Sequence, residues 1–153
     1  VRSNLEYGKS EATEDDLWEA LRIAQADDFV RALPEGLDTP VAQGGTHPSG
    51  GQRQRLAMAR ASSRRPEIYL FDDSFSALDM ATDARLRAAL RAVTRDSTVI
   101  VVAQRVSSVV DADQIVVLDD GRLVGVGTHE DPLVTCPTYA EIVDSQELVG
   151  DAA

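Results

Sequence analysis

The 153-residue sequence has almost no cysteine and almost no lysine, since Cys136 and Lys9 are the single residues of each kind. One cysteine cannot build an internal disulfide framework, which is compatible with the cytosol. No apolar run approaches the length that spans a bilayer, and no signal peptide opens the chain. These residues therefore predict neither a cross-linked secreted domain nor a membrane span.

Positive charge is also scarce, because 15 basic residues stand against 26 acidic ones and the net charge is −11. A chain of this charge repels phosphate backbones, so the composition disfavours a nucleic-acid partner. Hydrophobic residues make up 43% of the sequence, which is typical of a soluble globular protein. At this length we expect one domain, or part of one, with a real hydrophobic core.

The first part of the sequence carries helical signals. Val1–Gly8 looks like a lead-in or a short strand, and Thr13 with Asp16 forms a near-capping box that predicts the start of a helix. Further along we expect a helix over 27–33 that stops at Pro34, a turn over 34–38, a Gly-rich loop over 39–48, and a helix over 50–63.

Strands then alternate with helices, which predicts an α/β fold with an all-α segment in front. Two short apolar runs read as strands buried on both faces. The predicted strands are Ile68–Phe71, Thr98–Ala103, and a hairpin of Ile115–Leu118 with Arg122–Val126; the predicted helices are Ala81–Val93, Tyr139–Val149, and a short one that Thr128 caps and that meets Pro132.

The segment Ser49-Gly50-Gly51-Gln52 opens the helix predicted over 50–63. Serine can cap a helix, and two glycines let backbone N–H groups approach a ligand closely. Such a helix start favours an anion, above all a phosphate. A Ser-capped helix after a glycine loop is common in any protein, but the run Gln52–Arg55 that follows it favours the phosphate interpretation.

The strand over 68–71 ends in two carboxylates, Asp72 and Asp73. This arrangement can hold Mg²⁺ and a water beside a nucleotide, although two acids can also simply end a strand. The sequence Ser76-Ala77-Leu78-Asp79 follows directly and argues against the simpler reading. Together with the phosphate-binding helix start, the motifs point to ATP.

These three motifs, in this order and spacing, resemble the nucleotide-binding domain of ABC transporters over about residues 1–134. Ser49–Gln52 matches the family signature, 68–73 the Walker B strand and 76–79 the D-loop. The resemblance implies part of a P-loop ATPase core with an α-helical subdomain. It divides the chain into a lead-in (1–10), the helical subdomain (11–65), the second half of the core (66–134), and a C-terminal helix and tail (135–153).

The resemblance also implies the role of each site residue. Ser49, Gly50 and Gly51, followed by Gln52, would bind the γ-phosphate of ATP held by a different subunit, and Asp79 belongs to the same cofactor-binding set. Asp72 would hold Mg²⁺ through water. Asp73 stands where the family has its catalytic Glu, and Gln104 stands where it has the switch His.

Several positions depart from the family pattern. Aspartate is one methylene shorter than glutamate, and glutamine cannot titrate as histidine does, so the site built on Asp73 and Gln104 looks degenerate. Pro48 replaces the usual Leu. Gln43 and Gly44 replace a Glu and a basic residue in a loop typical of exporters, and we interpret His47 as a surface loop residue.

A P-loop requires G-x-x-x-x-G-K-[ST] after a strand, and Gly8-Lys9-Ser10 fits only its end. The first glycine of the pattern would fall at Ser3, with no strand before it. We therefore interpret Lys9 as an exposed loop lysine. We expect the P-loop strand to lie upstream, so that the chain is the C-terminal part of a nucleotide-binding domain and has no ATPase activity alone.

The resemblance implies an ATP- and Mg²⁺-dependent exporter at the cytoplasmic face of the membrane. Its partners would be a transmembrane domain and a second nucleotide-binding domain on a different subunit, with no nucleic acid. Two alternatives stay open: a related ATPase of DNA repair or chromosome maintenance, and a non-catalytic regulatory domain that only binds nucleotide or a partner.

Overall fold

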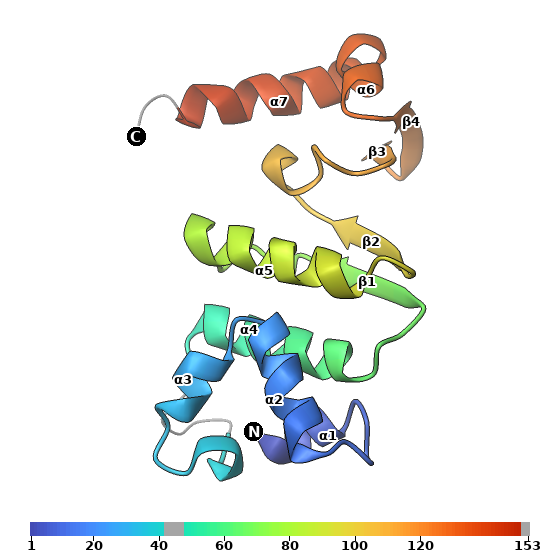
Figure 1. The fold of residues 1–153 in the computed structure, drawn as a ribbon. Helices are drawn as coiled ribbons and strands as arrows, with labels where there is room; N and C mark the ends of the chain where they lie inside the picture. Colours follow the sequence, from blue (N-terminus) through green and yellow to red (C-terminus); the bar gives the residue numbers. More distant parts are fainter. Residues whose placement is uncertain (42–47, 151–153) are drawn as a thin grey trace. The chain divides into compact units, whose positions relative to one another are not determined.

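The computed structural model describes residues 1–41 and 48–150, with the side chains of 147–150 left out. Gln43, Gly44 and His47, which the sequence analysis singled out, lie outside the described residues. The chain divides into two compact units, residues 1–100 and 101–153, which are described separately. The helices come first and strands then alternate with helices (Figure 1), so the predicted α/β class is confirmed.

Unit 1 begins with a helical part. Its helices are α1 (Arg2–Glu6), α2 (Glu14–Ile23), α3 (Asp27–Arg31), the 3-10 turn η1 (Gly36–Asp38) and α4 (Gly50–Ser63). Of the two readings of residues 1–8, the short strand is wrong, because α1 is a helix. Its Leu5 is fully buried, and α1 contacts α2 and α4. A five-residue helix has too few turns to show a periodic pattern, so tertiary packing rather than local sequence decides its conformation.

The predicted capping box at Thr13 is confirmed. The Oγ of Thr13 accepts from the N–H of Asp16, and the Asp16 carboxylate accepts from the N–H of Thr13. Lys9 lies in the loop before this helix, is exposed, and pairs with Asp16 at 3.2 Å. Ser3, where a P-loop would need a glycine, lies in α1. The interpretation of Lys9 as a surface loop lysine is therefore confirmed.

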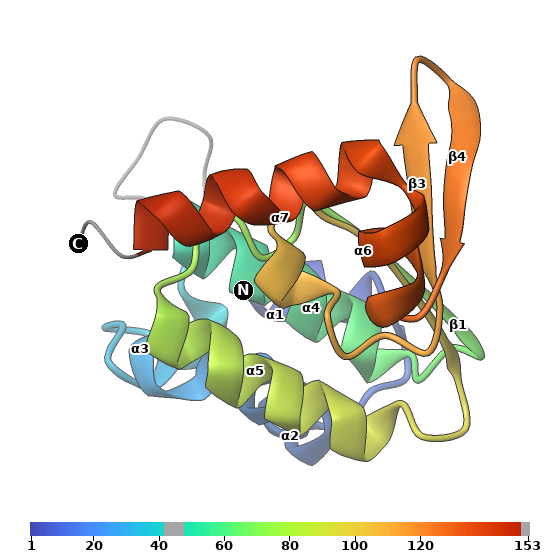
Figure 2. The ribbon, with the colours of Figure 1, turned by 90° about the horizontal axis from the view of Figure 1, so that it is seen from above.

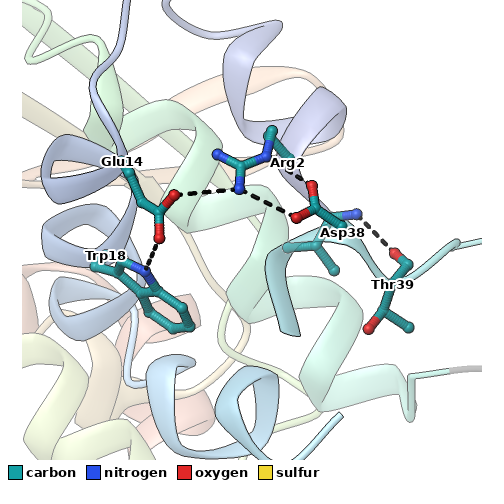
Figure 3. Close-up of polar contacts among 6 residues, drawn as sticks. Arg2, Glu14, Trp18, Asp38 and Thr39 are labelled. Atoms are coloured by element: carbon teal, nitrogen blue, oxygen red, sulfur yellow. Dashed lines mark hydrogen bonds and ion pairs between the residues drawn. The ribbon is translucent and has the colours of Figure 1, made fainter. Parts of the chain in front are cut away.

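Polar contacts join α1 to the following segments at the surface of unit 1 (Figure 3). The Arg2 guanidinium donates to Asp38 at 2.7 Å and to Glu14 at 3.3 Å, and Glu14 also accepts from the Trp18 indole. These pairs are exposed, so each contributes little to stability. The apolar core beneath them does more, since α2 packs against α4 through buried Leu17, Leu21, Leu56 and Ala59.

The strands β1 (Ile68–Asp72) and β2 (Thr98–Val102) pair with each other, and α5 (Met80–Val93) lies between them in the sequence. Tyr69 and Phe71 of β1 are buried, whereas Ile68 and Leu70 are 63% and 66% exposed. In β2, Thr98, Val99, Ile100 and Val102 are exposed. The two strands are confirmed, but the described residues bury only one face of β1 and leave most of β2 open.

Unit 2 contains the predicted hairpin of β3 (Ile115–Asp119) and β4 (Arg122–Gly127). Its turn residues Asp120 and Gly121 have φ of 45° and 73°, as two-residue hairpin turns require. The helices α6 (Glu130–Thr135) and α7 (Pro137–Gly150) lie beside the hairpin (Figure 2). The core of this unit consists of Ile115, Val117, Cys136, Tyr139 and Val143.

Thr128 does not cap α6 as predicted. The N-cap is His129, without a side-chain hydrogen bond, and Pro132 lies inside the first turn. The Asp131 carboxylate reaches back instead and accepts from the N–H of Thr128 at 2.9 Å and from its hydroxyl at 2.8 Å. The Thr128 hydroxyl thus donates to an acidic side chain of the first turn instead of accepting from a helix N–H, which the Thr128 position alone could not reveal.

Candidate functional site

Ser49 starts α4 with a complete capping box. Its Oγ accepts from the N–H of Gln52 at 3.3 Å, and the Gln52 side chain accepts from the N–H of Ser49 at 2.8 Å. The N–H groups of Gly50 and Gly51 lie in the same first turn, where a helix has no acceptors of its own. These four residues therefore form an ordered helix start that fits an anion.

The two glycines differ in what surrounds them. A Cβ on Gly51 would stand 2.8 Å from the carbonyl oxygen of Ala77, which is closer than such atoms come in proteins. A Cβ on Gly50 would meet only the Cβ of Ala77, at an ordinary 3.7 Å. Gly51 is therefore required where α4 contacts the loop after β1, whereas Gly50 is free of that constraint.

That loop, residues 73–79, is called here the β1–α5 loop. Asp72 is the last residue of β1 and Asp73 the first of the loop, and both are exposed. Asp73 has φ of 47°, in the left-handed region that aspartate tolerates better than most residues. Phe75 and Leu78 are buried and fix the loop to unit 1, so the two carboxylates stand at the end of an anchored strand.

Asp79 closes the β1–α5 loop as the N-cap of α5. Its Oδ1 accepts from the N–H of Thr82 at 2.9 Å. That backbone hydrogen bond is the main cause that lowers the pKa of Asp79. The carboxylate is therefore charged and held in place at the start of α5.

Gln54 joins the two motifs, and the sequence analysis assigned it no role. Its Nε2 donates to the carbonyl of Asp73 at 3.3 Å and to the Oγ of Ser76 at 3.2 Å. Its Oε1 accepts from the N–H of Ala77 at 3.2 Å. The only sequence signal for Gln54 was its position five residues after Ser49. That position alone does not show a contact with residues 73–77.

Arg55 fixes the start of α4 on its other side. One guanidinium nitrogen donates to the carbonyl of Gln25 at 2.6 Å, and the group lies 5.1 Å from the centre of the Phe29 ring. Burial lowers the pKa of Arg55, which nonetheless stays charged at neutral pH. The turn between α2 and α3 therefore supports the helix that carries Ser49–Gln52.

Gln104 lies in unit 2 and is exposed. Its carbonyl accepts from Nε2 of Gln146 on α7 at 2.7 Å, and Oε1 of Gln146 accepts from the N–H of Val106 at 2.8 Å. One side-chain amide thus binds the backbone on both sides of Arg105. Sequence reasoning missed Gln146, because 42 residues separate it from Gln104.

The residues fit a nucleotide with Mg²⁺ better than a metal held by protein alone. Over the described part of the chain, no three His, Cys, Asp or Glu side chains gather in a group that could hold a metal ion. Mg²⁺ at nucleotide sites takes one or two carboxylates together with waters and phosphate oxygens. Exposed Asp72 can supply one such carboxylate, and the first-turn N–H groups of Gly50 and Gly51 can supply donors to phosphate.

Within residues 1–41 and 48–150, none of the helices combines the length and the apolar character needed to cross a bilayer. A family profile described as "ABC transporter" matches residues 2–76. An ABC transporter ATP-binding protein of Mycobacterium tuberculosis is 58% identical over 151 residues, which are 97% of this chain and 26% of that protein.

A multidrug resistance ABC transporter ATP-binding and permease protein of Lactococcus lactis is 40% identical over 98% of this chain and 26% of its own length. A solved structure of a bacterial Atm1-family ABC exporter with ATP bound has a TM-score of 0.88 and 40% identity, over 94% of this chain and 25% of that one. The chain thus spans about a quarter of the length of these relatives. All of them are transporter proteins, which favours the transporter over a DNA-maintenance ATPase.

Proposed function

We propose that this chain, which belongs to the ABC transporter family, is part of the ATP-binding domain of a membrane exporter in which ATP hydrolysis drives transport. The Atm1-family exporter and the multidrug resistance protein support the direction of transport. The transmembrane domain lies in the same transporter, and the chain acts at the cytoplasmic face of the membrane. It binds ATP together with Mg²⁺, and Asp72 holds the metal through water.

The partner is a second ATP-binding domain, and Ser49–Gln52 completes the ATP site of that partner. The observation that carries this proposal is the capped helix start Ser49–Gln52, where Gly50 and Gly51 carry no side chain. Backbone N–H groups there donate to the γ-phosphate, and the positive end of the α4 dipole favours its charge.

The site built on this chain's own Asp72 and Asp73 hydrolyses ATP poorly. A general base must come within hydrogen-bond distance of the water that it activates, and a misplacement of about 1 Å can cost on the order of 100-fold in rate. Aspartate at position 73 reaches one methylene less far than glutamate. Gln104 can donate a hydrogen bond but cannot take up a proton. The intact transporter is therefore an asymmetric pair of two different domains.

ATP turnover of variants in the full-length pair, in membranes, tests this proposal. Gly51→Asp adds a negative charge at the start of α4, where it repels a phosphate and also meets the Ala77 carbonyl, and turnover should collapse. Asp73→Asn and Gln104→Ala should have much smaller effects, and Asp73→Glu with Gln104→His should raise hydrolysis at this chain's own site. If Asp73→Asn abolishes turnover as completely as Gly51→Asp, the asymmetric assignment is wrong.

The 153-residue chain by itself should release no phosphate from ATP, because its sequence offers no P-loop pattern to bind the phosphates. Steady-state phosphate release by the purified chain is the measurement. Turnover that survives stringent purification and disappears with Asp72→Asn would contradict this expectation.

A further inference from the structure

Gln54 connects the helix start Ser49–Gln52 to the β1–α5 loop. We propose that it is a positioning residue that couples this chain's two functions, completing the partner's ATP site and building its own. Nucleotide bound at one of these two ATP sites then changes nucleotide binding at the other site through the Gln54 amide. This inference rests on the proposed function, since it assumes that both places bind nucleotide.

The three hydrogen bonds fix the orientation of the amide without ambiguity. The carbonyl of Asp73 can only accept, so Nε2 must face it at 3.3 Å. The N–H of Ala77 can only donate, so Oε1 must face it at 3.2 Å. The Oγ of Ser76 takes the second N–H at 3.2 Å. The side chain thus uses three of its four hydrogen-bonding positions on one short loop.

Two other polar contacts of the loop are local. The Oγ of Ser74 donates to the carbonyl of Asp72, and the Oγ of Ser76 donates to that of Asp73, over two and three residues. The Gln54 bonds instead reach 19, 22 and 23 residues along the chain. They therefore tie the backbone that carries the Asp73 carboxylate to a different helix.

A second contact on the same face of α4 also joins this helix to the β1–α5 loop. Gly51 lies three residues before Gln54, and positions three apart share a helix face. At Gly51 the Ala77 carbonyl comes closer than any side chain would permit. With Gln54 holding the loop and Gly51 pressed against it, a shift at the start of α4 moves the Asp73 backbone as well.

The experiment measures coupling between the two sites in the full-length pair. Asp72→Asn weakens Mg²⁺ binding in this chain's own site, and the ATP concentration at half-maximal turnover reports on the site that Ser49–Gln52 completes. We expect Asp72→Asn to shift this concentration about fivefold or more, the usual lower range of coupling between sites. In a Gln54→Met background, Asp72→Asn should leave the ATP concentration at half-maximal turnover unchanged.

Methionine has nearly the shape of glutamine without its hydrogen bonds, so Gln54→Met separates bonding from packing. Ala61→Met places the same side chain at an exposed position of α4 and should leave the shift intact. Ser76→Ala removes one of the three bonds and should reduce the shift partly, which keeps the test available if Gln54→Met folds poorly. A plain structural defect would lower the amount of active protein without removing the dependence on Asp72.

An equal shift in the parent and Gln54→Met backgrounds overturns the inference, and so does the absence of any shift in the parent. Gly51→Asp, measured in parallel, distinguishes a failure of the proposed function from a failure of the coupling through Gln54. If Gly51→Asp leaves turnover intact, the proposed function itself fails. If it abolishes turnover while Gln54→Met keeps the full shift, the coupling through Gln54 alone is wrong.

Discussion

The carbonyl oxygen of Ala77 lies 2.8 Å from the point where a Cβ on Gly51 would stand. The backbone of α4 and that of the β1–α5 loop therefore meet with no side chain between them at that position. One residue earlier, the space beside Gly50 would hold a methyl group at an ordinary distance of 3.7 Å. The two glycines are equivalent in sequence but not in structure.

Gly51→Ala should lower the stability of the chain by about 1–3 kcal/mol, because either the helix or the loop must move. Gly50→Ala is the matched control, and it should leave stability unchanged or raise it by about 0.5–1 kcal/mol, since alanine favours the helix. Urea unfolding followed by circular dichroism gives both values. Equal losses for the two variants would show that the Ala77 contact does not constrain Gly51.

Gln146→Ala should loosen the segment around Gln104 by removing a hydrogen bond on each side of Arg105. Losing an acceptor worth about 1 kcal/mol should make the Val106 amide exchange with solvent roughly fivefold faster. Gln146→Glu retains an acceptor for Val106 and loses the donor to Gln104, so it should protect Val106 better than Gln146→Ala does. Ser145→Ala, at an exposed neighbour that bonds only within α7, is the control. Unchanged Val106 exchange in Gln146→Ala would contradict this prediction.

The purified chain should self-associate through the open face of β1. Ile68 and Leu70 stand exposed on that strand, and exposed apolar strands associate with one another. Light scattering over a concentration series should show the mean mass rising, and Ile68→Thr with Leu70→Thr should reduce the rise. Val134→Thr, at a residue that is 86% exposed on α6, should not reduce it. A strictly monomeric parent that melts cooperatively would count against this prediction.

Acid should weaken unit 1 through the capping box of α2. Hydrogen bonds from the backbone and hydroxyl of Thr13, and then from Lys9, lower the pKa of Asp16. A carboxylate whose pKa is lowered by folding stabilises the fold above its unfolded value, about 3.9, and that contribution is lost as the pH falls through the lowered value.

Urea midpoints between pH 7 and pH 3 test this. Asp16→Asn should lower the midpoint at pH 7, and its difference from the parent should shrink toward pH 3. Asp15→Asn removes the same charge from the same turn without breaking the capping box, so it should have a smaller effect at pH 7. A constant difference for Asp16→Asn across this pH range would exclude the carboxylate as its cause.

The sequence predicted the features that depend on neighbouring residues. The capping box of Thr13 with Asp16 and the cap formed by Ser49 each involve residues three positions apart, and the hairpin turn at Asp120-Gly121 needs two adjacent residues with positive φ. The features that it missed depend on distant ones. Gln54 contacts residues 19 to 23 positions away and Gln146 one 42 away, and an amide side chain carries no pattern that indicates its partner. The apolar run of β1 indicated that this strand needs neighbours on both faces, but not which of its faces the described residues cover.

The left-handed backbone of Asp73, with φ of 47°, decides which substitutions there are informative. Asparagine adopts this conformation about as readily as aspartate, so Asp73→Asn removes the charge and leaves the backbone alone. Glutamate does not, and it carries a conformational cost of about 1–2 kcal/mol. This conformational cost therefore makes the measured rate gain from Asp73→Glu smaller than the gain that the longer carboxylate provides. Asp73→Gln shares the cost without the charge, so the ratio of the two rates isolates what the longer carboxylate contributes.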